Sequence, residues 1–206
     1  MKFTVAIDGP AAAGKGTISK RVAEEFGLAH LDTGLLYRAT GARVIAGEDA
    51  VEAAQNLTPE DMARDDLRNT DVAQAASKAA AIPDVRAALV QFQHDFARRE
   101  GGAVLDGRDI GTVICPEADV KLFITASDEV RAERRYLELV VKGEDVTRES
   151  VRTAMAERDA RDSERETSPL AAAQDAIVID TSQMLIHDAV AAAIRRVRPR
   201  FKDAAG

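Results

Sequence analysis

The sequence has 206 residues, 46% hydrophobic and 31% charged, which is enough to bury the core of one domain with appendages but not of two full domains. Its net charge of −7 argues against a protein that coats nucleic acid, because that function needs a basic surface. The single cysteine, Cys115, excludes a disulfide framework and a four-thiolate zinc site, and it indicates a reducing compartment.

The first apolar run ends at Asp8 and is shorter than the hydrophobic region of a secretory signal. No later run approaches the length of a transmembrane helix. The basic residues between 195 and 202 suit the C-terminal end of a helix, where positive charge is favourable. We therefore expect a cytoplasmic protein whose partners include neither a membrane nor a nucleic-acid polymer.

Five short apolar segments predict strands, and four of them end beside an aspartate. These segments are residues 3–7, 28–31, 103–105, 120–124 and 176–179. Helical patterns lie between them, so the connections are crossovers and the sheet should be parallel, with helices on both faces. Because ligands bind beyond the carboxyl ends of such strands, Asp8, Asp32 and Asp106 should gather at the binding edge.

Two stretches depart from this alternation. Residues 36 to about 100 are rich in alanine and contain no convincing strand, with a helix start at Thr58-Pro59 and a break at Pro83. Residues 143–168 are highly charged and poor in large apolar side chains. We interpret both as insertions into one domain. The predicted division is a core of residues 1–35, 84–142 and 169–206, with insertions at 36–83 and 143–168.

The loop after the first predicted strand carries glycines and a lysine and leads into a helix. Strand, glycine-bearing loop, lysine and helix form the context of a phosphate-binding P-loop. Glycine lets the backbone turn successive N–H groups toward one point, and the helix that starts near Lys15 adds its positive end. Gly16 stands where the general pattern has Ser or Thr, which here comes one position later as Thr17. The alternative is a tight turn with a solvated lysine.

Two further motifs follow predicted strands. In residues 32–38, Arg38 can grip a phosphate with two hydrogen bonds; taken alone, it could also be a surface arginine paired within the protein. Residues 105–112 place two glycines, Arg108 and two acids in one turn, which is more than a connection needs. The alternative for this second motif is an internal arginine–aspartate turn.

A third motif lies in the second insertion. On a helix, Arg158, Arg161, Asp162 and Arg165 fall along one face. Arginines four residues apart repel each other unless an anion lies between them. The segment is therefore either a helix laced by its own acidic residues or a lid that closes arginines over transferring phosphates.

The motifs GPxxxGKGT, DTGxxYR, DGRDIGT and ERDxRDxxR, in this order and spacing, resemble those of the bacterial cytidylate kinases, a family of P-loop nucleoside monophosphate kinases. Residues 72–77 and 83–86 are also similar to that family, and the resemblance covers nearly the whole chain. It implies a three-layer P-loop NTPase fold with a five-stranded parallel sheet, a helical acceptor-binding insertion and a lid. It also implies transfer of the γ-phosphoryl group of ATP to CMP or dCMP with Mg²⁺, and we expect a monomer.

The resemblance assigns residues to the ATP side and to the transfer step. The ATP phosphates would be held by Gly9, Pro10, Ala11, Ala12, Ala13, Gly14, Lys15, Gly16 and Thr17. Thr17 would also face the metal ion, directly or through water, and Arg134 would lie near the adenine end. Catalysis would rest on Lys15, Arg158, Arg161 and Arg165.

The resemblance also assigns an acceptor site. Its residues would be Asp32, Thr33, Tyr37, Arg38, Ser77, Arg86, Arg108, Asp109, Arg158 and Asp162. Within this set, Arg38 and Arg108 would take the CMP phosphate and Asp162 the ribose. Ser77, Arg86 and Asp109 would recognise cytosine, with Asp109 accepting from the amino group and Arg86 donating to the ring acceptors.

One departure from the family concerns the first insertion. The family usually carries a longer insert with a small antiparallel sheet between the positions of Arg38 and Ser77. Here 38 residues separate the two, with no alternating pattern, so we expect a reduced acceptor domain.

Two other functions remain open from the sequence. A kinase for a small hydroxyl compound such as shikimate would share the P-loop, and Asp32 or Asp109 could then act as the base. A nucleotide-binding switch of the GTPase type would need an Asn-Lys-x-Asp motif. Asn56 and Asn69 are followed by Leu and Thr, so that motif is absent.

Overall fold

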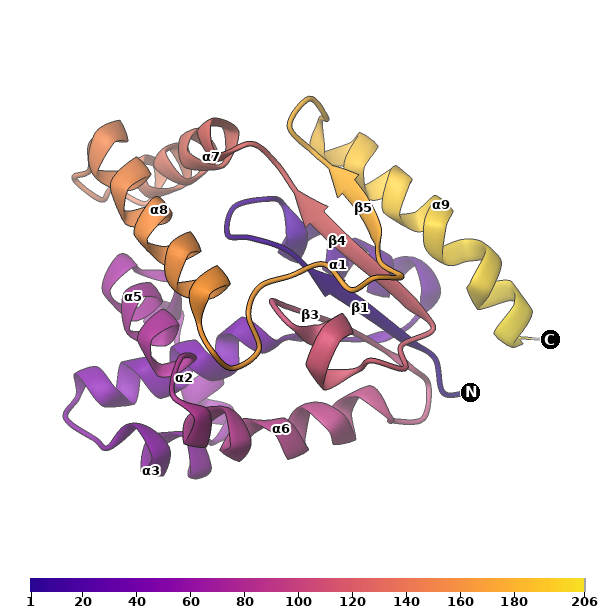
Figure 1. Ribbon diagram of the computed structural model, residues 1–206, viewed down its shortest axis with the longest axis horizontal. Helices are drawn as coiled ribbons and strands as arrows, with labels where there is room; N and C mark the ends of the chain where they lie inside the picture. Colours follow the sequence, from indigo (N-terminus) through magenta and orange to yellow (C-terminus); the bar gives the residue numbers. More distant parts are fainter. Residues whose placement is uncertain (206) are drawn as a thin grey trace.

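Five parallel strands form the central sheet of the computed structural model, which describes residues 1–205 (Figure 1). The strands are β1 (Thr4–Asp8), β2 (Ala29–Asp32), β3 (Ala103–Gly107), β4 (Val120–Thr125) and β5 (Ile177–Asp180). Their spatial order is β2-β3-β1-β4-β5. Each predicted strand is confirmed to within two residues at either end, and so is the α/β class with a parallel sheet.

Helices connect the strands on both faces of the sheet. They are α1 (Lys15–Phe26), α2 (Thr33–Ile45), α3 (Ala50–Gln55), α4 (Pro59–Met62), α5 (Thr70–Ala79), α6 (Pro83–Ala97), α7 (Asp128–Val141), α8 (Arg148–Glu164) and α9 (Ile186–Ala205). A 3₁₀ turn, η1 (Asp65–Arg68), and a π turn, η2 (Ile110–Ile114), complete the described chain. Among residues 1–205, no helix combines the length and the apolar character needed to cross a lipid bilayer.

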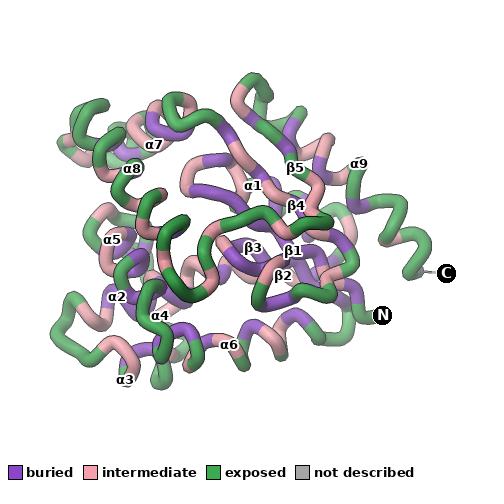
Figure 2. Tube along the Cα trace, in the orientation of Figure 1, coloured by how far each residue is buried: buried purple, intermediate pink, exposed green. Residues whose placement is uncertain are grey.

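The two faces of the sheet follow from the alternation of side chains along each strand. In β1, Val5 and Ile7 join the core cluster that contains α1 and α9. The intervening Ala6 points to the opposite face, where it joins Leu105 of β3 in the cluster with α6 and η2. β1, β3 and β4 form the buried centre between these helical layers, and the edge strands β2 and β5 are more exposed (Figure 2).

The segment between β2 and β3 is helical throughout, as predicted. Helices α2, α3, α5 and α6 share an apolar cluster around Leu36 and Leu89. α4 begins with a capping box in which Thr58 and Asp61 each accept a hydrogen bond from the other's backbone N–H. α6 begins at Pro83, where a missing N–H costs nothing because the first turn has no intrahelical acceptor.

The charged segment after α7 has more apolar packing than its composition indicates. Val151 and Met155, four residues apart on α8, are buried against Ala132 and Leu139 of α7. The sharp turn between the two helices uses Gly143 at φ 80°. α8 therefore lies on α7 as a helical pair at one end of the sheet (Figure 1).

Gly9, directly after β1, is required by a close backbone approach. Its φ is 148°, and a Cβ atom at this position would lie 1.9 Å from the carbonyl oxygen of Ile124 on β4. The sheet and the loop that leaves it can meet here only without a side chain.

We expect Gly9→Ala to lower the free energy of unfolding by more than about 2 kcal/mol, because the methyl group adds a backbone clash to an unfavourable φ. Urea unfolding followed by circular dichroism measures this value. Gly16→Ala is the matched control, since a Cβ at Gly16 meets nothing within 4 Å and the residue is helical. Equal stability of the two variants would contradict the steric account.

Candidate functional site

The loop between β1 and α1 has a backbone shape suited to anions. Gly9, Ala12 and Gly14 all have positive φ, at 148°, 58° and 92°. Such left-handed residues between ordinary ones turn neighbouring N–H groups to the same side. α1 begins at Lys15, directly after the loop, so the unbonded N–H groups of its first turn add to the same positive region.

Two distant side chains hold the carbonyl groups of this loop. Arg131 of α7 donates from Nη1 to the carbonyl oxygen of Ala11 at 3.2 Å. Thr181, after β5, donates from Oγ1 to the carbonyl oxygen of Ala13 at 3.0 Å. In a trans peptide the C=O and the next N–H point in opposite directions, so these anchors orient the following N–H groups away from Arg131 and Thr181.

Lys15 is nearly buried, and its charge is only partly compensated. Its Nζ lies 3.8 Å from Oδ1 of Asp106 at the end of β3. Burial, followed by repulsion from Arg108, lowers the pKa of Lys15 to about 8 despite the attraction of Asp106. An anion entering the site would restore the charge on this lysine.

A pocket of about 70 Å³ opens beside Lys15 at the carboxyl edge of the sheet. All ten residues predicted for the acceptor site line it, together with Lys15 and Arg165. The lining side chains that were predicted are Lys15, Asp32, Thr33, Tyr37, Arg38, Ser77, Arg86, Arg108, Asp109, Arg158, Asp162 and Arg165. They come from five helices, the end of β2, the turn after β3 and the residue after α8.

One end of the pocket is built on Asp109. Arg86 of α6 forms a buried ion pair with this carboxylate, and Nη2 of Arg165 lies 3.6 Å from its Oδ1. The Arg86 guanidinium also lies 5.7 Å from the centre of the Tyr37 ring. Burial raises the pKa of Asp109, although both arginines oppose that shift. The buried Nη2 of Arg165 makes no hydrogen bond, so it is available to a ligand.

The middle of the pocket is organised by Asp162 of α8. Its carboxylate accepts from Nε of Arg108 at 2.9 Å and from Oγ of Ser77 at 3.4 Å, and Nε of Arg158 lies 3.8 Å away. Burial raises the pKa of Asp162, but Arg108 and Arg158 together bring it below its ordinary value. This aspartate is the shared counter-charge of two arginines.

Arg38 lies at the far side of the pocket. It donates from Nη1 to the carbonyl oxygen of Leu67 at 2.7 Å, which ties α2 to η1. Burial lowers the pKa of Arg38 to about 10, while Asp32 partly opposes that shift. Asp32 also pairs with Arg68 at 3.2 Å. Arg38 is therefore a half-buried cation with no carboxylate within 4.0 Å among residues 1–205.

Two arginines of the second insertion, Arg158 and Arg165, line this pocket, whereas the predicted Arg161 does not and contacts α5 instead. Arg161 donates to Gln74 and, at 3.3 Å, to Ser77 of α5. Burial, and then repulsion from Arg108, lowers the pKa of Arg158 to about 9. α8 ends at Glu164, so Arg165 extends from the residue after the helix and not from its face; it donates to the carbonyl oxygen of Ser168. The contacts join α8 to other elements, unlike those of a helix laced only by its own acids.

Two further predicted residues lie away from the acceptor pocket. Arg134 of α7 donates to both oxygen atoms of Thr181, at 2.9 and 2.7 Å. Thr17 is exposed in the first turn of α1. Both border the loop that begins after β1.

Asp8 lies at the predicted edge of the sheet, but its carboxylate is engaged by backbone N–H groups. Its carboxylate accepts from the N–H groups of Ile110 and Gly111, both at 2.7 Å. Burial raises the pKa of Asp8 to about 6 despite these two bonds. The side chain therefore shapes the turn after β3 and leaves no free oxygen for a ligand.

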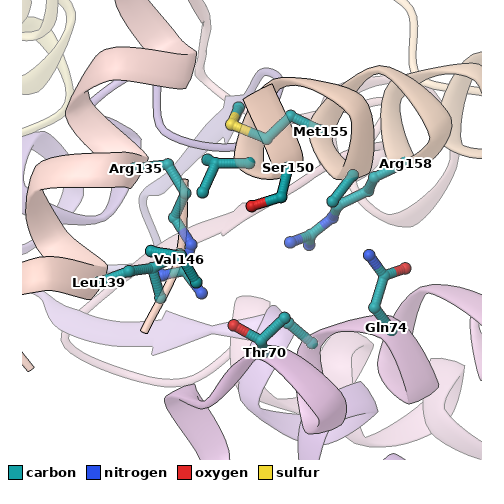
Figure 3. A pocket seen from close by; sticks show the side chains of 11 residues that line it. Thr70, Gln74, Arg135, Leu139, Val146, Ser150, Met155 and Arg158 are labelled. Carbon is teal, nitrogen blue, oxygen red and sulfur yellow. The ribbon is translucent and has the colours of Figure 1, made fainter. Parts of the chain in front are cut away.

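A second and larger cavity, of about 240 Å³, lies on the other side of Arg158 (Figure 3). It is enclosed by α5, α7 and α8, and its lining is mainly apolar, with Leu139, Val146 and Met155 opposite Thr70 and Gln74. It contains neither Lys15 nor the aspartates of the smaller pocket. We place the chemistry in the smaller, charged pocket because the groups that neutralise anions converge there.

The side chains present can be compared with the ligands of the Mg²⁺ ion that the family implies. Within residues 1–205, no three His, Cys, Asp or Glu side chains come together as a metal-binding group. Mg²⁺ usually keeps several waters and binds through substrate phosphates and few protein groups. The exposed Thr17 hydroxyl beside the loop fits such a water-rich site.

Sequence reasoning missed several residues that shape the site. Arg68 lies in the stretch of the first insertion where no motif was recognised, and Gln74 lies in the matching segment 72–77 but was given no role; they contact Asp32 and Arg161. Arg131 was missed beside the predicted Arg134. The signal for Arg131 would have been its spacing from Arg134 and Arg135 on one helix. That spacing brings Arg131 to the loop and Arg134 to Thr181.

Comparison of backbones supports the fold. An uncharacterized protein from Eubacterium ventriosum is similar with a TM-score of 0.59 and 15% identity, over 95% of this chain and 98% of that one. A gluconokinase from Sinorhizobium meliloti is similar with a TM-score of 0.53 and 15% identity, over 99% and 96% of the two chains. At this identity the likeness concerns the fold alone.

Comparison of sequences is more specific. Cytidylate kinases of Cereibacter sphaeroides and Xanthobacter autotrophicus are 62% and 54% identical to this chain. The first covers 97% of both chains, and the second 96% of this chain and 98% of its own. The family model described as cytidylate kinase matches residues 5–199. With a match of this extent and relatives this similar over nearly their whole length, the chain belongs to the cytidylate kinase family.

Proposed function

We propose that this protein transfers the γ-phosphoryl group of ATP to CMP or dCMP, giving ADP and CDP or dCDP. The observation that supports this most is the convergence of Lys15, Arg38, Arg108 and Arg158 on one pocket beside the loop after β1. Two phosphorylated nucleotides carry the negative charge that would balance these four cations.

The ATP phosphates bind in the loop of residues 9–17, on the backbone N–H groups and Lys15. Arg134 and Thr181 border the outer side of this loop, where the adenine end of ATP lies in this proposal. Mg²⁺, near Thr17 and the phosphates, would neutralise part of the charge on the transferred group.

The acceptor lies in the charged pocket. Its phosphate binds Arg38 and Arg108, and its ribose contacts Asp162, which Arg108 already holds at 2.9 Å. The ion pair of Arg86 and Asp109 forms the cytosine end, with Ser77 beside it. An amino group that donates and a ring nitrogen that accepts match this carboxylate and guanidinium. Asp32, Thr33 and Tyr37 line the remaining wall.

Residues 143–168 act as the lid and residues 36–83 as the acceptor-binding insertion in this proposal. Contacts between Arg161 and α5, and between Asp162 and Arg108, support a closed arrangement of the two. Arg158, Arg161 and Arg165 would then stabilise the phosphates from the lid side.

The reaction needs no general base. The second pKa of a phosphate monoester is about 6, so the attacking oxygen is already anionic near pH 7. The protein has to align two phosphates and neutralise charge spread over the transferred group. Lys15 and the arginines supply this, and a closed lid excludes the water that would otherwise hydrolyse ATP.

The carboxylates that a hydroxyl kinase would use as a base are otherwise engaged. Asp32 pairs with Arg68 at 3.2 Å, and Asp109 pairs with Arg86 and lies near Arg165. Multiple-turnover formation of CDP from ATP and CMP, compared with phosphorylation of hydroxy acids such as shikimate, tests the assignment. Faster turnover of a hydroxy acid would overturn it, and the absence of repeated turnover would favour a nucleotide switch.

We also propose that the protein acts as a monomer in the cytoplasm. One chain supplies the cations and the carboxylates that the proposed reaction needs, so the proposed site requires no second copy. The buried, free Cys115 is suited to a reducing compartment.

Lys15→Ala should lower kcat by about 10²–10³, because one positioned charge on the transferred phosphate is lost. The fold should persist, since Lys15 faces the pocket and not the core clusters. A coupled assay of ADP formation with CMP gives the rate, and circular dichroism checks the fold. Near-normal turnover would remove the loop after β1 from the mechanism.

Binding of an ATP analogue at pH 8 should take up about half a proton. Lys15 has a pKa of about 8 in the free protein, and bound polyphosphate raises that pKa, so the neutral fraction becomes protonated. Calorimetry in two buffers with different ionisation enthalpies measures the uptake. It should fall toward zero at pH 6.5 and shrink in Lys15→Met. An unchanged uptake in that variant would assign the proton to another group.

Asp109→Asn should reduce the ratio of kcat/KM for CMP over UMP by about tenfold or more. The amide can donate to the uracil carbonyl, and the charged contact to the cytosine amino group is lost. ATP affinity should change little, because the ion-pair partners of Asp109 are Arg86 and Arg165 and not Lys15. Equal losses for both pyrimidines would mean that Asp109 holds Arg86 and Arg165 in place and does not read the base.

A further inference from the structure

His30 lies on β2, the edge strand beside β3, and its side chain contacts Asp106 at the end of β3. The register pairs His30 with Val104 and Asp32 with Asp106. Because side chains alternate along a strand, Asp106 projects from the same face as Val104, diagonally from His30. The two side chains meet at 2.7 Å, between Nε2 of His30 and Oδ2 of Asp106.

Asp106 divides its two oxygens between two partners. Oδ2 faces His30, and Oδ1 lies 3.8 Å from Nζ of Lys15. An ionised carboxylate only accepts, so Nε2 is the donor. The backbone carbonyl of Asp106 accepts from Oγ1 of Thr33 at 2.8 Å, which fixes the end of the strand. Asp106 itself is only 2% exposed, so no bulk water replaces a lost partner.

The separation between Lys15 and Asp106 matters for the reaction. At 3.8 Å the ammonium is attracted but not hydrogen-bonded, since such bonds are 2.7–2.9 Å long. Lys15 can therefore leave Asp106 for a phosphate at small cost. If Oδ2 of Asp106 lost its donor, the buried carboxylate would need another hydrogen bond. The nearby ammonium of Lys15 would then be drawn in to donate it.

We propose that His30 is a positioning residue for phosphoryl transfer. It holds the Asp106 carboxylate turned so that Lys15 remains free to bind the phosphates of ATP. The proposal rests on the proposed function, because its readout is transfer from ATP. His30 touches neither nucleotide; it acts through Asp106 on Lys15.

Two substitutions separate the hydrogen bond from the ring. His30→Phe keeps a ring of similar size without a donor, and we expect kcat to fall about tenfold and the KM for ATP to rise. His30→Gln places an N–H near the position of Nε2, and we expect activity within about threefold of the parent. The affinity for CMP alone should stay within twofold in both, because the CMP contacts proposed above use Arg38, Arg108 and Asp109 and not His30, Asp106 or Lys15. His94→Phe on α6 is the control for a histidine lost elsewhere.

A merely structural role would produce other results. Equal losses in His30→Phe and His30→Gln, or a matching loss of CMP affinity, would overturn the proposal, as would a folded His30→Phe with parental kinetics. Nuclear magnetic resonance of ¹⁵N-histidine tests the contact without activity. We expect a proton on Nε2 whose shift changes in Asp106→Asn; a bare Nε2 would also overturn it. If the parent forms no CDP while this resonance is present, the proposed function fails and the contact stands.

Discussion

The site depends on keeping several cations out of water without binding them too tightly. Lys15, Arg38 and Arg158 are all desolvated enough to lower their pKa values. A buried charge costs free energy unless a partner offsets it. The protein supplies aspartates, but it places them at 3.8 Å from Lys15 and 3.8 Å from Arg158, longer than a hydrogen bond. The remaining attraction is left for phosphate.

This incomplete compensation explains why the counter-charges come from different elements. Asp106 ends β3, Asp109 follows it, and Asp162 belongs to α8. In the proposed closure, α8 would deliver arginines together with the carboxylate that keeps them from repelling Arg108. The proposed lid would therefore add both signs of charge, and closing it before the nucleotides arrive would cost less than the arginines alone would require.

Much of this arrangement could be predicted from the sequence. Apolar runs that end in aspartate located the strands and their shared edge, because period-two alternation and parallel crossovers leave few topologies. The motif residues Arg38, Arg108 and Asp162 reach one pocket, as the resemblance implied. The sequence could not show that Asp8 is used up by two backbone N–H groups. It also could not pair Arg68 with Asp32 or Gln74 with Arg161, since those contacts depend on how short helices pack.

The anchors of the loop between β1 and α1 bear on the order in which the chain can fold during synthesis. The loop leaves the ribosome early, but its carbonyl groups are held by Arg131 and Thr181, which come 120 and 168 positions later in the chain. Its first strand likewise pairs with β3 and β4, both of which are made after the helical insertion. Contacts of such long sequence separation form slowly and late. The nascent protein therefore cannot complete the proposed nucleotide site until β5 and Thr181 have emerged.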